Sequence, residues 1–180
     1  AEEIPGFFAG YAAVKEGYRH LGFLGGMSVP AVIRFGYGFV QGCEKAAAEM
    51  GISDKVTVEY VYGGQFYGDQ TITATMHGWY QQRGVEVVFA CGGGIWTSAC
   101  EAAAKTNGKV IGVDVDQTAL INKYGEGMCV TSAMKGLGAT VKASLKSIAD
   151  GKFGDEYAGK VSSLGLVSGT DLEANFVELP

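Results

Sequence analysis

The sequence predicts an α/β fold built on a parallel β-sheet. Short apolar runs alternate with longer segments of helical periodicity, which is the pattern of consecutive βαβ units. Most of the apolar runs end in glycine or in a polar residue, as strands do where a parallel sheet presents its loops. The 180 residues are enough for one ordinary domain that buries a core of its own.

The expected strands are short and rich in β-branched and aromatic residues, which favour extended backbone. We place them at residues 20–24, 56–62, 85–90, 109–113 and 128–132, with two terminal strands at 161–167 and 175–179. The first three strands end in Gly-Gly or Gly-Gly-Gly, and the fourth ends in Asp114. The ends of these strands are therefore the first place to look for a ligand site.

Helical segments fill the intervals between the strands. The segment from Pro30 to Met50 carries apolar side chains at spacings of three and four, with Ser28 as the expected N-cap. Further helices are expected at 69–83, capped by Asp69, and at 97–105 and 135–149. A first helix at 4–18 is apolar over much of its circumference, which predicts burial on several sides.

Composition excludes several classes of protein. A hydrophobic fraction of 47% argues against intrinsic disorder. Fourteen basic and nineteen acidic residues are dispersed without blocks, so no electrostatic footprint for nucleic acid is present. No run of about 18 apolar residues occurs, so no membrane-spanning helix is expected. The sequence starts at Ala1 without a methionine, and we expect it to be a piece of a longer protein.

The residues that usually carry catalysis or bind metal are sparse. The four cysteines form no CxxC pair, and only His20 and His77 could join them, so we expect buried free thiols and neither metal nor cofactor. No serine or cysteine has a base at a recognisable spacing. We therefore expect a binding protein rather than an enzyme.

The loops after the strands offer three kinds of candidate. The glycines at 92–94 precede a helix and resemble a phosphate cradle, but neither a GxGxxG after the first strand nor a P-loop is present. Asp114 suits two neighbouring hydroxyls of a sugar diol, although Asp114-Val-Asp116 also fits a metal-binding DxD. Phe66 lies outside any helical apolar stripe, which favours stacking on a planar ligand. The alternative for any one glycine loop is a simple tight turn.

Four motifs together resemble a known family. They are GFLGGM at 22–27 followed by Pro30, FACGGG at 89–94, VIGVDVDQ at 110–117 and VTSAMK at 130–135. In this order they resemble the basic membrane protein (BMP) family, the lipoprotein substrate-binding components of ABC importers that include purine nucleoside receptors. The resemblance covers nearly the whole chain, and the GVDVDQ and TSAMK pair is its most specific part.

The resemblance implies a type I periplasmic-binding-protein architecture, in which two doubly wound α/β lobes close on a ligand. It implies that residues 21–130 form the second ligand-binding lobe and that the first lobe is missing from this chain. Residues 1–20 would then be a helix packed against the missing lobe. Residues 131–180 would be a crossover segment, with a helix and terminal strands that belong partly to that lobe.

The resemblance also implies a ligand and its contacts. In nucleoside-binding members a phenylalanine stacks on the base, a glycine of the GG loop lies against the ligand, and an aspartate and a lysine hold the ribose. These positions fall on Phe66, on Gly92 or Gly93, on Asp114 and on Lys135. In place of a smaller glycine-containing turn found in many members, this chain has Ile95-Trp96.

The implied partners are a purine nucleoside or similar small molecule and an ABC permease, with no nucleic acid. The implied location is extracytoplasmic, on a membrane reached only through a lipid anchor that this chain lacks. The isolated chain is expected to self-associate through the apolar helices left without the first lobe. Two alternatives stay open, a ligand-sensing domain of a LacI-type regulator and a doubly wound enzyme acting on a sugar or nucleoside.

Overall fold

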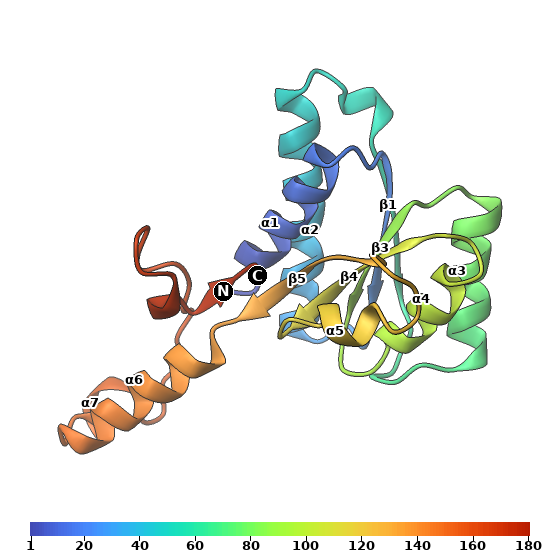
Figure 1. Cartoon of the computed structure of the whole chain (residues 1–180). Coiled ribbons are helices and arrows are strands. Elements are labelled where there is room, and N and C mark those ends of the chain that lie inside the picture. Colours follow the sequence, from blue (N-terminus) through green and yellow to red (C-terminus); the bar gives the residue numbers. More distant parts are fainter.

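The computed structural model describes residues 1–180, which fold around a six-stranded sheet (Figure 1). Its strands lie in the order β2-β1-β3-β4-β5-β6. The first five strands are parallel, and β6 pairs antiparallel with β5. The bounds are β1 (His20–Gly25), β2 (Thr57–Tyr62), β3 (Val87–Cys91), β4 (Lys109–Asp114), β5 (Cys129–Lys135) and β6 (Val177–Glu178). The predicted α/β class and doubly wound parallel sheet are confirmed.

Helices cover both faces of the sheet. The helices α1 (Glu3–Lys15) and α2 (Pro30–Glu49) lie on one face, and α3 (Gln70–Gln82) and α4 (Trp96–Ala103) lie on the other (Figure 1). A short α5 (Thr118–Ile121) joins β4 to β5. Two more helices, α6 (Leu137–Ala149) and α7 (Phe153–Glu156), follow β5, and 3₁₀ turns occupy Ser53–Lys55 and Leu172–Ala174.

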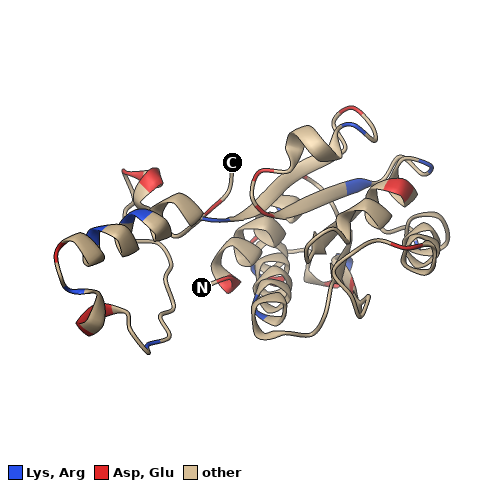
Figure 2. Ribbon diagram, turned by 90° about the horizontal axis from the view of Figure 1, so that it is seen from below, with Lys and Arg blue, Asp and Glu red and all other residues tan.

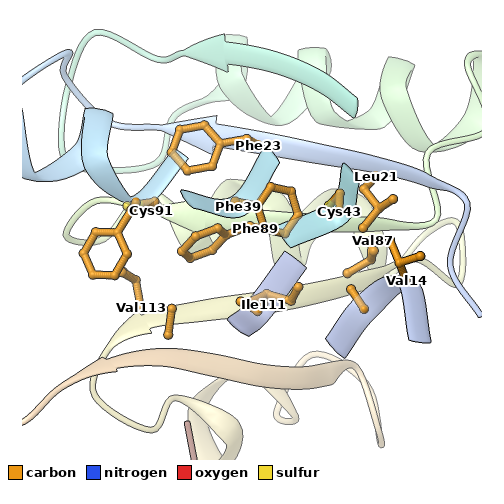
Figure 3. Packing of buried hydrophobic residues seen from close by; sticks show 14 of the residues in the cluster. Val14, Leu21, Phe23, Phe39, Cys43, Val87, Phe89, Cys91, Ile111 and Val113 are labelled. Carbon is orange, nitrogen blue, oxygen red and sulfur yellow. The ribbon is translucent and has the colours of Figure 1, made fainter. Parts of the chain in front are cut away.

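Alternation along the strands divides the core into two layers, because successive side chains of a strand point to opposite faces. Phe23 of β1 and Phe89 of β3 lie in the layer under α1 and α2, whereas Leu24 and Ala90 lie in the layer under α3 and α4. The rings of Phe23 and Phe89 meet edge to face at 5.4 Å, and Phe39 of α2 lies 5.3 Å from Phe89 (Figure 3). This arrangement of rings is a favourable one for aromatic pairs.

Glycines allow α1 and α2 to pack backbone against backbone. A Cβ atom would overlap a carbonyl oxygen of the facing helix at each of four positions, Gly6, Gly10, Gly38 and Gly42. This close approach buries Ala9, Ala13 and Val14 completely, while Phe7 and Phe8 are half-buried. The first helix is thus an integral part of this domain on its α2 side.

Two predictions for local structure are wrong, and a third is only partly right. The segment 161–167 forms no strand, because it lies outside the sheet and makes only isolated backbone hydrogen bonds, such as that from the Phe176 N–H to the Gly165 carbonyl oxygen at 3.1 Å. Val161 is fully exposed. The terminal strand expected at 175–179 is reduced to Val177–Glu178. Ser28 does not cap α2, since Val29 occupies the N-cap position and no side-chain cap bond is made. Asp69 caps α3 as predicted, accepting a hydrogen bond from the Ile72 N–H at 2.8 Å.

The strand expected at 128–132 extends to Lys135, and the following helix begins only at Leu137. Pairing with β6 explains the extension, because Met134 and Lys135 lie opposite Glu178 and Val177. The Gly136 N–H then donates to the Phe176 carbonyl oxygen at 2.8 Å. Lys135 therefore belongs to the sheet rather than to a helix.

The α6 and α7 helices form an arm that projects from the body (Figure 1). One side of α6 is an exposed apolar stripe, defined by side chains that are 50–61% exposed, namely Leu137, Val141, Leu145 and Ile148. Basic and acidic residues are interspersed along the arm and the body (Figure 2). None of the helices combines the length and apolar character needed to cross a bilayer.

Candidate functional site

The carboxyl ends of four neighbouring strands bring the predicted residues to one edge of the sheet. Gly26 follows β1, Gly92 follows β3, Asp114 ends β4 and Lys135 ends β5. The strand order reverses direction between β1 and β3, because β2 lies on the far side of β1. In open α/β sheets, ligands bind at this kind of switch point, outside the carboxyl ends of the strands.

Phe66 packs on the glycines of the switch point. The Gly26 N–H donates to the Cys91 carbonyl oxygen at 2.8 Å, which draws the ends of β1 and β3 together. A Cβ on Gly26 would lie 2.5 Å from a ring carbon of Phe66, and one on Gly92 would lie 3.0 Å from it. Only glycine therefore leaves room for the ring at these positions.

The position of Phe66 is fixed through its backbone, while its ring stays accessible. The Gly94 N–H donates to the Phe66 carbonyl oxygen at 2.7 Å, and Gly93 adopts a left-handed φ of 53° beside it. Phe66 is 36% exposed, whereas Phe35, on the apolar stripe of α2, is 1% exposed. The ring is thus seated on glycine backbone and available for a contact from outside the chain.

Asp114 and Lys135 form an ion pair on the adjacent strands. The Lys135 ammonium lies 2.8 Å from an Asp114 carboxylate oxygen, and the two side chains are 33% and 41% exposed. The same ammonium lies 5.5 Å from the ring centroid of Phe35, within the range of a cation–π contact. Both charges are held in place, and both remain open to solvent at the edge of the sheet.

The backbone at Asp114 is strained. Its φ is 69°, one of only two left-handed values among the non-glycine residues. The Val115 N–H donates to the Val113 carbonyl oxygen at 2.8 Å, which closes a γ-turn with Asp114 at its apex. A γ-turn of this hand is rare and strained, and such strain is concentrated at functional sites. The turn was not apparent from the sequence, because nothing in GVDVDQ specifies a positive φ.

The four thiols are free and largely buried. None forms a disulfide, three are buried and Cys129 is half-buried. Burial raises the pKa of Cys43 and that of Cys100 to about 12, and it raises the pKa of Cys91 well above its usual value. A thiol in this state supplies no thiolate at neutral pH. No three His, Cys, Asp or Glu side chains are grouped closely enough to hold a metal ion.

The structure thus brings all five sequence-predicted residues to one edge, with Phe66, Gly92 and Gly93 in one cluster and Asp114 and Lys135 in the next. Their roles toward a ligand stay predictions. Sequence reasoning missed the second contact of Phe35, a core residue whose ring also faces the Lys135 ammonium. The unusual Trp96 is half-buried and packs edge to face with Tyr124 at 6.0 Å.

Comparison with known proteins now places the chain in a family. The family described as ABC transporter substrate-binding protein PnrA-like, the Bmp family, matches residues 2–169. The chain belongs to this family. The resemblance inferred from the four sequence motifs is confirmed. Proteins of this family bind substrates for ABC transporters, and they are transport components rather than enzymes.

Curated relatives in the Bmp family support the same assignment. The ABC transporter nucleoside-binding protein BmpA of Lactococcus lactis is 32% identical over 171 residues, which are 85% of this chain and 46% of that protein. Basic membrane protein D of Borreliella burgdorferi is 29% identical over 187 residues, which are 99% of this chain and 51% of that protein. The chain spans about half the length of these relatives.

Solved structures agree on the fold. A solute-binding protein of an ABC transporter system from Aeropyrum pernix is 22% identical with a TM-score of 0.72, over 99% of this chain and 48% of that one. An arabinose-binding protein from Geobacillus stearothermophilus is 14% identical with a TM-score of 0.68, over 100% of this chain and 60% of that one. A transcriptional activator from Bacillus halodurans also matches, at 21% identity and a TM-score of 0.62, over 83% of this chain and 48% of that one. These likenesses concern the fold alone, which is shared by transport and regulatory proteins.

Proposed function

We propose that this Bmp-family chain is one ligand-binding lobe of an ABC importer's solute-binding protein, and that its ligand is a nucleoside, a purine nucleoside foremost. The observation that carries the proposal is that Phe66 on its glycine seat and the Asp114–Lys135 ion pair lie at the same edge of the sheet, at the ends of neighbouring strands. The nucleoside-binding name of the Lactococcus lactis relative, at 32% identity, supports the choice of ligand.

Each residue has a role that its chemistry allows. The exposed ring of Phe66 stacks on the planar base. The Asp114 carboxylate accepts hydrogen bonds from the two neighbouring hydroxyls of the ribose, and the Lys135 ammonium donates to a hydroxyl oxygen. Gly92 and Gly93 let the backbone approach the ligand without a side chain in the way. Asp114 already neutralises Lys135, so the edge favours a neutral nucleoside over a phosphorylated one.

The first lobe, which lies outside this chain, encloses the ligand from the other side. The solved relatives are about twice as long as the part that this chain matches, and the exposed apolar stripe of α6 suits packing against further structure. The arm from Gly136 onward therefore belongs partly to the first lobe, and the outer side of α1 faces it. The complete protein binds without chemistry outside the cytoplasm, serves a permease, and is held at the membrane by a lipid.

The test is calorimetry on the chain joined to its first lobe, with adenosine, inosine, uridine, 2′-deoxyadenosine, adenosine monophosphate and free ribose. We expect the nucleosides to bind, and ribose and the monophosphate to bind much more weakly. Phe66→Ala should weaken binding about tenfold or more, because stacking on one base contributes about 1–3 kcal/mol. Phe153→Ala, which removes an exposed ring from the distant α7, is the matched control.

Asp114→Ala and Lys135→Met should each weaken riboside binding, and Asp114→Ala should do so more for a riboside than for its 2′-deoxy form. A polar group that is left without its hydrogen-bond partner in the closed site lowers the binding free energy by about 1–3 kcal/mol. Native affinity in the Phe66→Ala variant would show that its ring only packs. Formation of product from adenosine or inosine would favour the enzyme alternative, and a DNA-binding domain on the same polypeptide would favour the regulator.

A further inference from the structure

Two buried polar side chains lie directly behind Asp114. The Val113 N–H donates to the Gln117 side-chain oxygen at 2.9 Å, and the Gln117 N–H donates to the Ser132 hydroxyl oxygen at 3.0 Å. Gln117 is 6% exposed and Ser132 is completely buried. Gln117 comes from the turn after β4 and Ser132 from β5. Their two hydrogen bonds, called the clasp below, therefore connect the strands that end in Asp114 and Lys135.

The clasp lies where the sheet is irregular. The pairing of β4 with β5 shifts register between Val110 and Gly112, which interrupts the ladder of backbone hydrogen bonds. A Cβ on Gly112 would lie 2.7 Å from both the Gln117 oxygen and the Ser132 oxygen. The absence of a side chain at Gly112 is what allows the two polar groups to reach the backbone at this point.

We infer that Gln117 and Ser132 are positioning residues, which hold the strained γ-turn at Asp114 and so aim its carboxylate at Lys135 and at the ligand. The inference rests on the proposed function of Asp114. A left-handed φ at a non-glycine residue persists only when its surroundings fix it. The Gln117 bond to the Val113 N–H fixes the residue just before Asp114, and the Ser132 bond fixes Gln117 in turn.

The rest of the β4–β5 connection is tied independently of this clasp. An Asp116 carboxylate oxygen accepts from the Thr118 N–H at 2.9 Å, and the Asn122 side-chain oxygen accepts from the Cys129 N–H at 2.9 Å. Loss of the clasp should therefore release the turn at Asp114 while the connection as a whole stays folded. This separation makes the inference testable with single substitutions.

The variant for the test is Gln117→Met, which keeps the length of the side chain and removes its acceptor. Gln82→Met, at an exposed position of α3, is the matched control, and Ser132→Ala is the milder variant if Gln117→Met does not fold. In the two-lobed protein, we expect Gln117→Met to weaken riboside binding about tenfold, the loss of one buried hydrogen bond. The 2′-deoxyriboside should lose less, as it does in Asp114→Ala.

A residue that acts through Asp114 adds nothing once the Asp114 carboxylate is gone. The double variant Gln117→Met/Asp114→Ala should therefore bind as Asp114→Ala alone does. Losses that add up in the double variant, or equal losses for the riboside and the deoxyriboside, would overturn the inference.

A measurement without ligand separates this inference from the proposed function. In the crystal structure of the Gln117→Met variant we expect the φ of Asp114 to leave the left-handed region and its contact with Lys135 to open. An unchanged turn and ion pair would overturn the inference even if nucleosides bind. If the wild-type protein binds no nucleoside, the proposed function fails, while the altered turn still supports the positioning role of Gln117.

Discussion

The helices α1 and α6 have the same length of 13 residues, yet they lie in opposite environments. Six residues of α1 are buried, whereas Ser147 is the only buried residue of α6. The difference lies in whether the small residues of the helix face a neighbouring helix. Glycine and alanine let α1 lie backbone to backbone on α2, while the bulky side chains of α6 point away from the body.

Polar contacts reinforce this contrast. Glu2 holds Arg34 at 2.7 Å near the start of α1, and the Tyr11 hydroxyl donates to Glu49 at 2.6 Å near its end. The ion pair of α6, in contrast, joins Lys146 and Asp150 at one end of the helix itself. The glycines of α1 thus face a helix that packs against them, whereas the apolar stripe of α6 is uncovered in this chain.

The largest expected effect is at the α1–α2 contact. Gly42→Ala should destabilise the chain by about 3 kcal/mol, because the added methyl overlaps the Phe7 carbonyl and cannot be accommodated by a rotamer change. Gly138→Ala in α6 is the control, since nothing lies within 4 Å of its added methyl. The control should be neutral or stabilising by up to about 1 kcal/mol. Denaturant unfolding measures both, and equal stabilities would contradict the close packing described for α1.

The second prediction concerns the chain on its own. We expect the 180 residues to self-associate through the exposed apolar stripe of α6, as a symmetric dimer, because an uncovered apolar surface tends to find a partner. Val141→Lys with Leu145→Lys should raise the dimer dissociation constant about tenfold or more. Light scattering over a dilution series checks this. A monomer at all concentrations would show that the apolar stripe of α6 does not mediate self-association.

The third prediction uses pH. Tyr11, Lys15 and Lys45 surround Glu49 and lower its pKa to about 2, from an ordinary value near 4.5. A carboxyl with a lowered folded-state pKa contributes stability above its unfolded value, and that contribution is lost as the pH falls. Stability should therefore drop between about pH 4.5 and 2, and less so in Glu49→Gln. Glu156→Gln on α7 is the control. If stability depends on pH in the same way in the wild type and both variants, the contacts of Glu49 with Tyr11 and Lys15 do not stabilise this end of α1.

The smallest expected effect is at the arm. Leu145→Ala should change the free energy of unfolding by no more than about 0.5 kcal/mol, because the side chain is 61% exposed. Leu21→Ala, which empties a fully buried site in β1, should cost about 2–5 kcal/mol. A large loss in Leu145→Ala, measured at a concentration where the chain is monomeric, would mean that α6 is packed in solution.

The sequence was sufficient for the five parallel strands and for the sheet edge at which they end. Apolar runs that end in glycine or in Asp114 located these strands, because strand ends and turns are local signals. The role of that edge in ligand binding stays a prediction. The segment 161–167 was predicted as a strand because its β-branched residues favour extended backbone. It does not join the sheet, and pairing with a neighbouring strand is not a local signal. Lys135 was expected at the start of a helix because its pairing with β6 joins residues more than forty positions apart.

The finer parts of the site depend on contacts that spacing cannot reveal. The left-handed turn at Asp114 lies beside the hydrogen bonds of Gln117 and Ser132, which are 15 residues apart in the chain. Phe35 sits where its helical stripe predicts, in the core. Its second contact, with the Lys135 ammonium, joins residues of α2 and β5 that are far apart in the sequence.

The join between body and arm has a mechanical consequence. Two residue pairs link β5 to β6, and one of them contains Lys135, the residue whose ammonium meets Asp114. Gly136 follows at once, against the backbone of Phe176, where no side chain would fit. The arm therefore leaves the body directly after the residue that forms the ion pair, so any displacement of the arm would act on the backbone next to Lys135.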